Sequence, residues 1–414
     1  MSVYYPENPL IVQGDHTVLV EVDGPRYVEA RDQLARFAEL IKSPEHIHTY
    51  RITPLSIWNA AAAGVDPEEI VETLREFSKY EVPQHVAVEI RDYASRYGRL
   101  QLTLVGDDLV LIVNDRPLAE EISRHKQVAP LLDERLSDVE FRVAPSSRGK
   151  LKQALVKAGF PAEDLAGYRP GKSLEIILRE ISLAGELFYL RGYQQEAVEI
   201  FHAAGAARGG SGVIVLPCGA GKTIVGLACM SQLQTSTLIL TTSVTATRQW
   251  IGEVLDKTTL SKDQVGEYNG SRKDVLPVTV ATYNTMTWRE SKQAPFKHLD
   301  LFDQRDWGLI IYDEVHLLPA PVFQVTAGLQ ARRRLGLTAT LVREDGREDD
   351  VFALIGPKRS MFPGRCSSIR AGSPPRAAPR SVCRCRKNSA CPMPWPTAAK
   401  NSGWLRRTPP KWTL

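Results

Sequence analysis

Apolar and polar positions follow one pattern up to about residue 186 and another after it. In the first part, residues 26–41 have the spacing of an amphipathic helix. Residues 100–105 and 109–113 are apolar runs joined by Gly-Asp-Asp, which is a signal for a β-hairpin. The first part is therefore expected to mix helices and strands.

Two helix starts are marked by their capping residues. Thr53-Pro54 and Asp66-Pro67 each combine a side chain that can cap a helix with a proline at the first helical position. Short helices followed by a hairpin suggest a winged-helix-like module over residues 1–140. Such a module could contact DNA or serve only for packing. The pattern favours neither, because a fold does not fix a function.

The pattern changes to alternating strands and helices near residue 186. Residues 141–185 contain a helical stretch at 150–158 and a segment rich in Gly, Pro and charge at 167–172, and are interpreted as a connector. Beyond them, short apolar runs and helix-length segments alternate, which is typical of a parallel sheet with crossover helices. The expected strands are residues 213–216, 237–240, 278–281, 309–312 and 334–337. The predicted fold class is therefore α/β.

A glycine-rich loop follows the first of these strands. It has the sequence Leu-Pro-Cys-Gly-Ala-Gly-Lys-Thr at residues 216–223 and opens an apolar helix. Glycines let backbone N–H groups curl around a phosphate, and the helix N-terminus adds positive potential. Lys222 can neutralise phosphates, and the Thr223 hydroxyl can ligate Mg²⁺. The expected nucleotide contacts are Pro217, Cys218, Gly219, Ala220, Gly221, Lys222 and Thr223.

A second motif places two carboxylates at the end of a later strand. Residues 308–316 have the sequence Gly-Leu-Ile-Ile-Tyr-Asp-Glu-Val-His. Because the carboxyl ends of parallel strands meet at one edge of a sheet, Asp313 and Glu314 should lie near the glycine-rich loop. Asp313 is expected to hold Mg²⁺, and Glu314 to orient and deprotonate the attacking water.

Together, the two motifs resemble those of the superfamily-two helicase and translocase ATPases, with an Asp-Glu-Val-His box. The resemblance implies ATP and Mg²⁺ as cofactors. It also implies an adenine-reading segment just before the loop, here Leu-Arg-Gly-Tyr-Gln at residues 190–194, with Arg191 and Gln194 as base contacts. His316 would transmit the state of the γ-phosphate to motif III.

Further segments narrow the resemblance to the XPB helicases, over nearly all of residues 8–359. Residues 241–244 with Gln249-Trp250 resemble motif Ia, Thr282-Tyr283 a later DNA-backbone motif, and Leu-Thr-Ala-Thr at 337–340 motif III. Arg-Glu-Asp at 343–345 resembles an element characteristic of XPB proteins. Small hydroxyl residues suit a protein that holds the sugar-phosphate backbone. The implied DNA-binding and coupling residues are Thr242, Gln249, Thr282, Thr338, Thr340, Arg343, Glu344 and Asp345.

Charge and composition differ between residues 360–414 and the rest of the chain. The formal charge is +4, but residues 360–414 hold eight Arg, three Lys and no acid, which leaves 41 basic and 48 acidic residues elsewhere. Such an acidic body needs a local basic face to contact DNA. There is no apolar run of about 18 residues and no secretory signal. With only Cys218 and Cys229 in the body, a reducing compartment is expected. The resemblance to bacterial XPB proteins implies a cytoplasmic, nucleoid-associated protein without a membrane contact.

Residues 360–414 have three interpretations. Regrouped by one base, the codons for residues 361–365 permit Asp-Val-Pro-Trp-Lys, and those for 371–375 permit Gly-Trp-Ile-Ala-Pro. Both segments are expected of bacterial XPB proteins, so a single-base frameshift is the favoured interpretation. A basic arm that binds nucleic acid and a zinc site built from the four tail cysteines are the alternatives. The nucleotide sequence near codon 360 decides between them.

The favoured function is an ATP-dependent DNA helicase or translocase of XPB type, which by family moves 3′ to 5′. Residues 186–359 would form its first RecA-like lobe and residues 360–414 an irregular tail. Without a second lobe, this chain is expected to bind ATP and DNA weakly and to turn over little ATP.

The alternatives to this function are a non-catalytic ATP- and DNA-binding fragment and a different P-loop NTPase. DNA is the expected partner; the sequence specifies no nuclease, repair partner, pathway or oligomeric state.

Overall fold

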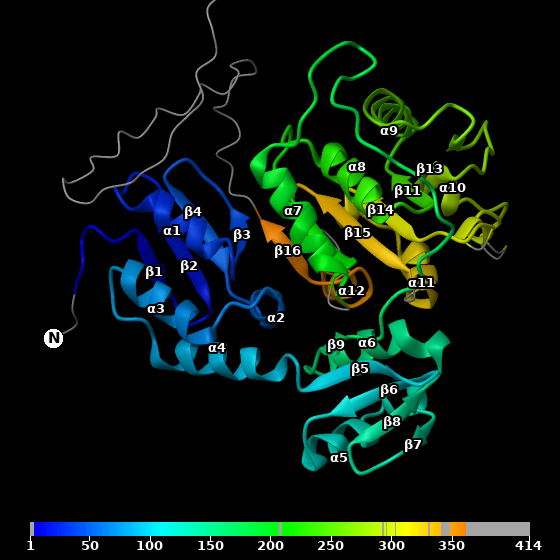
Figure 1. Ribbon diagram of the computed structural model, residues 1–414. Helices are drawn as coiled ribbons and strands as arrows, with labels where there is room; N and C mark the ends of the chain where they lie inside the picture. Colours follow the sequence, from blue (N-terminus) through cyan, green and yellow to red (C-terminus); the bar gives the residue numbers. More distant parts are fainter. Residues whose placement is uncertain are drawn as a thin grey trace, which may run out of the picture. The chain divides into compact units, whose positions relative to one another are not determined.

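The computed structural model describes residues 4–206, 209–291, 294, 296–302, 304–329, 332–340 and 348–361, all within one compact unit of the chain (Figure 1). The predictions for Arg343, Glu344 and Asp345, and those for the tail from residue 362 onwards, lie outside these residues. Within them, no helix is long and apolar enough to cross a membrane.

The chain begins with an antiparallel sheet of four strands in the order β1-β2-β4-β3. The strands are β1 (Leu10–Val12), β2 (Thr17–Glu21), β3 (Glu39–Lys42) and β4 (Ile47–Arg51). The helix predicted over residues 26–41 is wrong in its second half, because α1 covers only Tyr27–Leu34. Leu40 pairs with Tyr50 in the sheet, and this cross-strand pairing outweighs the helical spacing.

The two predicted helix starts are confirmed. Thr53 accepts a hydrogen bond from the Ser56 backbone N–H and caps α2 (Pro54–Ala62). Asp66 caps α3 (Pro67–Phe77) in the same way, through the N–H of Glu68. The helix α4 (Gln84–Arg96) follows.

The predicted hairpin is also confirmed, but it belongs to a larger sheet. Strands β5 (Leu100–Val105) and β6 (Asp108–Val113) pair antiparallel. They lie in a five-stranded sheet ordered β7-β8-β6-β5-β9. The other elements of this part are β7 (Glu134–Arg135), β8 (Glu140–Val143), β9 (Ala162–Asp164), α5 (Arg116–Arg124) and α6 (Arg148–Lys157). The sheet continues across the predicted boundary at residue 140. The stretch without named helices or strands between β9 and α7 is therefore residues 165–191, and the name connector is used for it from here on.

This segment without helices and strands is closely packed where it passes the parallel sheet. Gly171 has φ +74°, and a Cβ built there would lie 2.3 Å from the Gly308 backbone, so only glycine allows this approach. Thr235 donates a hydrogen bond to the Pro170 carbonyl at 2.8 Å. The connector is therefore held against the sheet by specific contacts.

The rest of the described chain forms a seven-stranded parallel sheet ordered β12-β13-β11-β14-β15-β10-β16. All five predicted strands are confirmed, and β12 and β16 were not predicted. The strands are β10 (Ser211–Val215), β11 (Thr237–Thr241), β12 (Val265–Tyr268), β13 (Val278–Thr282), β14 (Leu309–Asp313), β15 (Arg333–Thr338) and β16 (Lys358–Met361). The confirmed strands are rich in apolar residues and almost entirely buried, as expected where both faces of a parallel sheet are covered.

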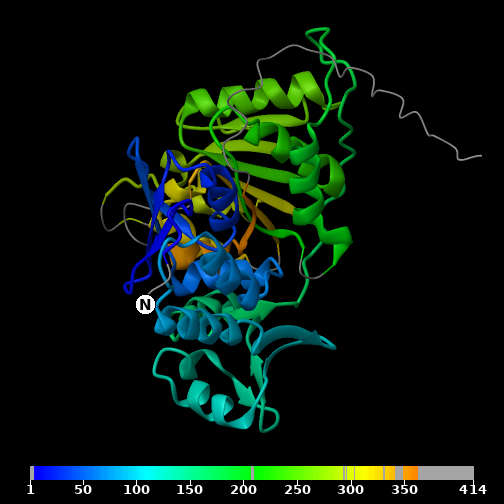
Figure 2. The same cartoon turned by 90° about the vertical axis from the view of Figure 1, so that its left-hand side faces the viewer.

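Helices cover both faces of this sheet (Figure 2). One buried cluster takes residues from α7 (Gly192–His202), α8 (Lys222–Leu233) and α9 (Val244–Lys257). The other takes residues from α10 (Tyr283–Met286), α11 (Ala320–Gly328) and α12 (Glu348–Leu354). Leu55 and Trp58 of α2 and Val156 of α6 belong to this second cluster, so the N-terminal elements share a core with the parallel sheet.

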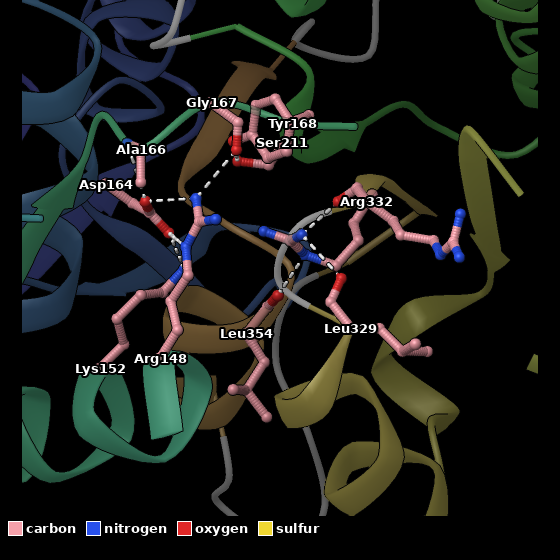
Figure 3. A network of polar contacts seen from close by, with 11 residues as sticks. Arg148, Lys152, Asp164, Ala166, Gly167, Tyr168, Ser211, Leu329, Arg332 and Leu354 are labelled. Atoms are coloured by element: carbon pink, nitrogen blue, oxygen red, sulfur yellow. Dashed lines mark hydrogen bonds and ion pairs between the residues drawn. The ribbon is translucent and has the colours of Figure 1, made fainter. Parts of the chain in front are cut away.

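A buried polar network joins α6 and β9 to the start of the connector (Figure 3). Arg148 donates two hydrogen bonds to Asp164, at 3.1 and 2.6 Å, and Lys152 forms an ion pair with the same carboxylate at 2.9 Å. The hydroxyl of Tyr168 donates to Ser211 of β10 at 2.8 Å. The network therefore links the five-stranded sheet to the parallel sheet.

Candidate functional site

The topology brings most of the predicted site residues to one edge of the parallel sheet. The glycine-rich loop follows β10, Asp313 ends β14, and Thr338 ends β15, which lies between these two strands. Thr242 follows β11 and Thr282 ends β13, further along the same edge. Because all these strands are parallel, their carboxyl ends face the same side.

The glycine-rich loop has the backbone that a phosphate cradle requires. Gly219 and Gly221 have φ +78° and +81°, which L-residues adopt only with strain. Gly221 caps α8, so the first N–H groups of this helix point out of its end without intrahelical partners. A Cβ on Gly221 would lie 2.6 Å from the Gln194 side chain. The loop is therefore closed on one side by α7 and open toward the sheet edge.

Lys222 lies beside the two acids of the second motif. Its Nζ is 3.1 Å from Glu314 Oε1. Asp313 is largely buried, and this burial, together with the nearby Glu314 charge, raises the pKa of its carboxyl above the ordinary value. Glu314 has φ +49°, and its second oxygen, Oε2, is buried without a hydrogen-bond partner among the described residues. A buried carboxylate oxygen left in this state is typical of a functional site.

His316 connects this acidic pair to motif III. Its Nδ1 is 2.8 Å from the Thr338 hydroxyl and 3.4 Å from Glu314 Oε2. The Thr338 hydroxyl donates to the Thr340 carbonyl, so it must accept from His316. This assigns the proton to Nδ1 and directs it at Thr338. A continuous path of contacts therefore runs from Lys222 through Glu314 and His316 to the end of β15.

The predicted adenine-reading segment lines a cavity of about 220 Å³ beside the loop. Gln194 accepts a hydrogen bond from the Arg191 backbone N–H and donates one to the Ala220 carbonyl, at 2.9 and 3.0 Å. Phe188 and Tyr189 line the same cavity and were not predicted. Aromatic residues directly before an adenine-reading motif were the sequence signal that could have identified them.

The remaining predicted residues are dispersed along the edge. Thr282 is buried and accepts a hydrogen bond from the Thr285 N–H, which makes it a helix cap. Thr242 is half-buried and Gln249 is exposed on α9. Among the described residues, no hydrogen bond or ion pair joins Thr242, Gln249 or Thr282 to the side chains of the acidic pair.

Trp250 belongs to the segment that resembles motif Ia, and it contacts the candidate site, although the sequence assigned it no role of its own. It is fully buried between α9 and the sheet, and its Nε1 donates to Asp313 Oδ2 at 2.9 Å. This hydrogen bond lowers the pKa of Asp313 against the effect of burial. Gly226 of α8 makes room for the ring, since a Cβ there would lie 2.5 Å from it. The indole thus fixes one oxygen of the candidate Mg²⁺ ligand.

Comparison with known proteins finds helicase relatives over most of the chain. Residues 10–137 match the family model "Helicase conserved C-terminal domain", and residues 187–343 match "Type III restriction enzyme, res subunit". The "DNA 3'-5' helicase XPB" of Kineococcus radiotolerans is 55% identical over 360 residues, which cover 86% of this chain and 62% of that protein. Over this region, the chain belongs to the XPB family.

Two further relatives extend the match. The "DNA 3'-5' helicase XPB" of Mycobacterium tuberculosis is 54% identical over 358 residues, covering 86% of this chain and 63% of that protein. The "General transcription and DNA repair factor IIH helicase/translocase subunit XPB" of Antonospora locustae is 31% identical over 373 residues, covering 86% of this chain and 53% of that protein. The chain therefore spans less than two thirds of the length of each of these three XPB relatives.

Proposed function

We propose that this chain is an ATP-dependent DNA helicase or translocase of XPB type, acting 3′ to 5′. The observation that carries the proposal is the contact path from Lys222 through Glu314 and His316 to Thr338. A protein that only binds nucleotide needs the phosphate loop and the acids. The path adds a route by which the state of the nucleotide can reach Thr338, one of the predicted coupling residues.

The residues at the sheet edge fit ATP and Mg²⁺. The open N-terminus of α8 and the two left-handed glycines suit phosphate oxygens. Thr223 and Asp313 would hold Mg²⁺, which when bound neutralises charge on the phosphates. Oε2 of Glu314 is buried without a hydrogen-bond partner among the described residues, and this carboxylate would orient the attacking water. Gln194 and Arg191, with Phe188 and Tyr189, would hold the adenine.

Nucleotide selection tests this assignment. The chain is titrated with fluorescent analogues of ATP and GTP in the presence of Mg²⁺, and ATP is expected to bind more tightly. Gln194→Ala should weaken ATP binding about tenfold and reduce the preference over GTP, because its amide would pair with the base edge. Gln195→Ala is the matched control, since Gln195 is exposed on the same helix and its side chain donates to the exposed Glu199. Equal binding of both nucleotides, or none, would contradict the proposal.

DNA binding and hydrolysis test the motor itself. Binding of labelled DNA should weaken steeply with salt if phosphates dominate the contacts. Stimulation of ATP hydrolysis by DNA would support a motor. ATP and DNA binding without such stimulation would favour the non-catalytic alternative for this chain.

Trp250→Phe is expected to weaken Mg²⁺-dependent nucleotide binding about tenfold. Without the indole N–H, the pKa of buried Asp313 rises further, and its carboxylate loses a charge-assisted hydrogen bond. The loss of nucleotide affinity should be larger at pH 5.5 than at pH 8, since a larger fraction of Asp313 is protonated at the lower pH. The measurement is the Mg²⁺ dependence of nucleotide affinity at both pH values.

Trp307→Phe is the control for this experiment. Trp307 is also fully buried, but its Nε1 donates to the Leu301 carbonyl before the start of β14, away from Asp313. An equal loss in both variants would show that a general packing defect, and not the bond to Asp313, is responsible.

A further inference from the structure

A second cavity lies on the same edge of the parallel sheet, away from the glycine-rich loop. It measures about 540 Å³ and shares no lining residue with the cavity beside Gln194. Its walls include Ser243 and Val244 at the start of α9, Thr282 at the end of β13, and Trp288 and His298 after α10. The volume is within the range of small-molecule pockets.

Trp288 presents an exposed aromatic ring to this cavity. Its side chain is 48% exposed, although it is one of the largest apolar groups of the chain. The His298 ring lies behind it, with ring centroids 5.9 Å apart. His298 is fixed in turn by the Tyr268 hydroxyl at 3.0 Å from its Nδ1. The tryptophan therefore belongs to an ordered aromatic wall and leaves one part of its surface unused.

The cavity combines this aromatic surface with groups that suit an anion. Lys273 is its one charged lining residue, and no carboxylate lines it among the described residues. The Lys273 Nζ lies 4.6 Å from the Tyr268 ring centroid, which holds the cation at the cavity wall. The N-terminus of the 14-residue helix α9 opens at Ser243, and its dipole favours negative charge. An aromatic face, a cation and a helix N-terminus together match the base and phosphate of one nucleotide.

We propose that this cavity binds an unpaired nucleobase of the DNA strand, stacked on Trp288. The inference rests on the proposed function, since it assumes that DNA follows this edge of the sheet. Asn284 is exposed at the cavity and can bond the edge of the base, while Ser243 and Lys273 face its phosphate. Backbone contacts alone allow a strand to slide. A stacked base would add a contribution to DNA affinity that depends on the bases and not on the phosphates.

The test compares two oligonucleotides of equal length and charge, oligo-dT and an abasic strand with the same backbone. Affinities are measured by fluorescence anisotropy. The chain should bind oligo-dT about tenfold more tightly than the abasic strand, as expected for one stacked base. Trp288→Ala should remove this difference by weakening oligo-dT binding alone, and Trp288→Phe should restore most of it. Tyr80→Ala is the control, because Tyr80 is exposed to a similar extent in the N-terminal part.

The outcomes separate the two proposals. Equal affinity for both strands, or an oligo-dT preference that survives in Trp288→Ala, overturns the stacking site and leaves DNA binding intact. Weaker binding of both strands by Trp288→Ala also overturns it, because the residue would then act on the backbone or on folding. Near-UV circular dichroism of the variant distinguishes these two causes. If the chain binds neither strand, the DNA part of the proposed function fails together with the stacking site.

Discussion

Replacing Lys222 by alanine is expected to lower the affinity for ATP about 10²-fold. The ammonium is largely buried and would face the phosphates that carry most of the charge of the ligand. Truncating one partner of a buried charge pair typically costs about 2–5 kcal/mol, and 1.4 kcal/mol corresponds to a factor of ten. The substitution should also weaken Mg²⁺ binding, which lowers the affinity for ATP further. Lys222 lowers the pKa of Asp313, so its loss favours the protonated acid, which cannot ligate Mg²⁺.

The measurement is calorimetric titration of the chain with ATP and Mg²⁺. Lys262→Ala is the matched control, because Lys262 is exposed in a turn before β12 and should bind ATP as the unaltered chain does. An affinity within about threefold of the unaltered chain would place the phosphates elsewhere. The assignment of the glycine-rich loop would then be wrong, even though its backbone has the expected conformation.

The parts of the fold that the sequence predicted well depend on local patterns. The five apolar-rich strands and the two helix starts at Thr53 and Asp66 are fixed by residues a few positions apart. The glycine-rich loop is also local, because Gly219 and Gly221 determine its backbone. Parallel topology then brings the loop and Asp313 to one edge without further information.

The parts that were missed depend on contacts between distant residues. Strand β16 is short and basic, and it joins the sheet beside β10. Asn59 of α2 accepts a hydrogen bond from the Lys358 N–H there, across 299 positions of the chain. Trp250 contacts Asp313 across 63 positions. No local spacing encodes such pairs, so the sequence could identify Asp313 and include Trp250 in motif Ia, but it could not show that the indole bonds this acid.

The second large effect is expected at Asp164, far from the candidate site. Asp164→Asn should destabilise the chain by about 3–5 kcal/mol, because it removes the carboxylate that Arg148 and Lys152 share and leaves the two buried cations close together. The side chains of Arg148 and Lys152 are each only 7% exposed, and that of Asp164 is 10% exposed. The measurement is urea unfolding followed by circular dichroism.

Two further variants test whether this loss of stability is specific to the buried Asp164 carboxylate or follows the loss of any ion pair. Asp138→Asn removes a carboxylate whose partner, Arg116, is 69% exposed, and should cost no more than about 1 kcal/mol. Lys152→Met should also cost less than Asp164→Asn. Burial lowers the pKa of Lys152 to about 8 even though Asp164 opposes this shift, and Arg148 would still pair with Asp164.

The pH dependence of stability gives an independent test of the same network. Burial alone would raise the pKa of Asp164, but the charges of Lys152 and Arg148 outweigh it and hold that pKa well below its ordinary value. A lowered native pKa means that the unfolded chain binds the proton more readily. The stabilisation is therefore present above about pH 4 and is lost as the pH falls below it. Asp164→Asn should lack this component of acid destabilisation, so the difference in stability between the two proteins should shrink at low pH. A constant difference would mean that the carboxylate contributes through packing and not through its charge.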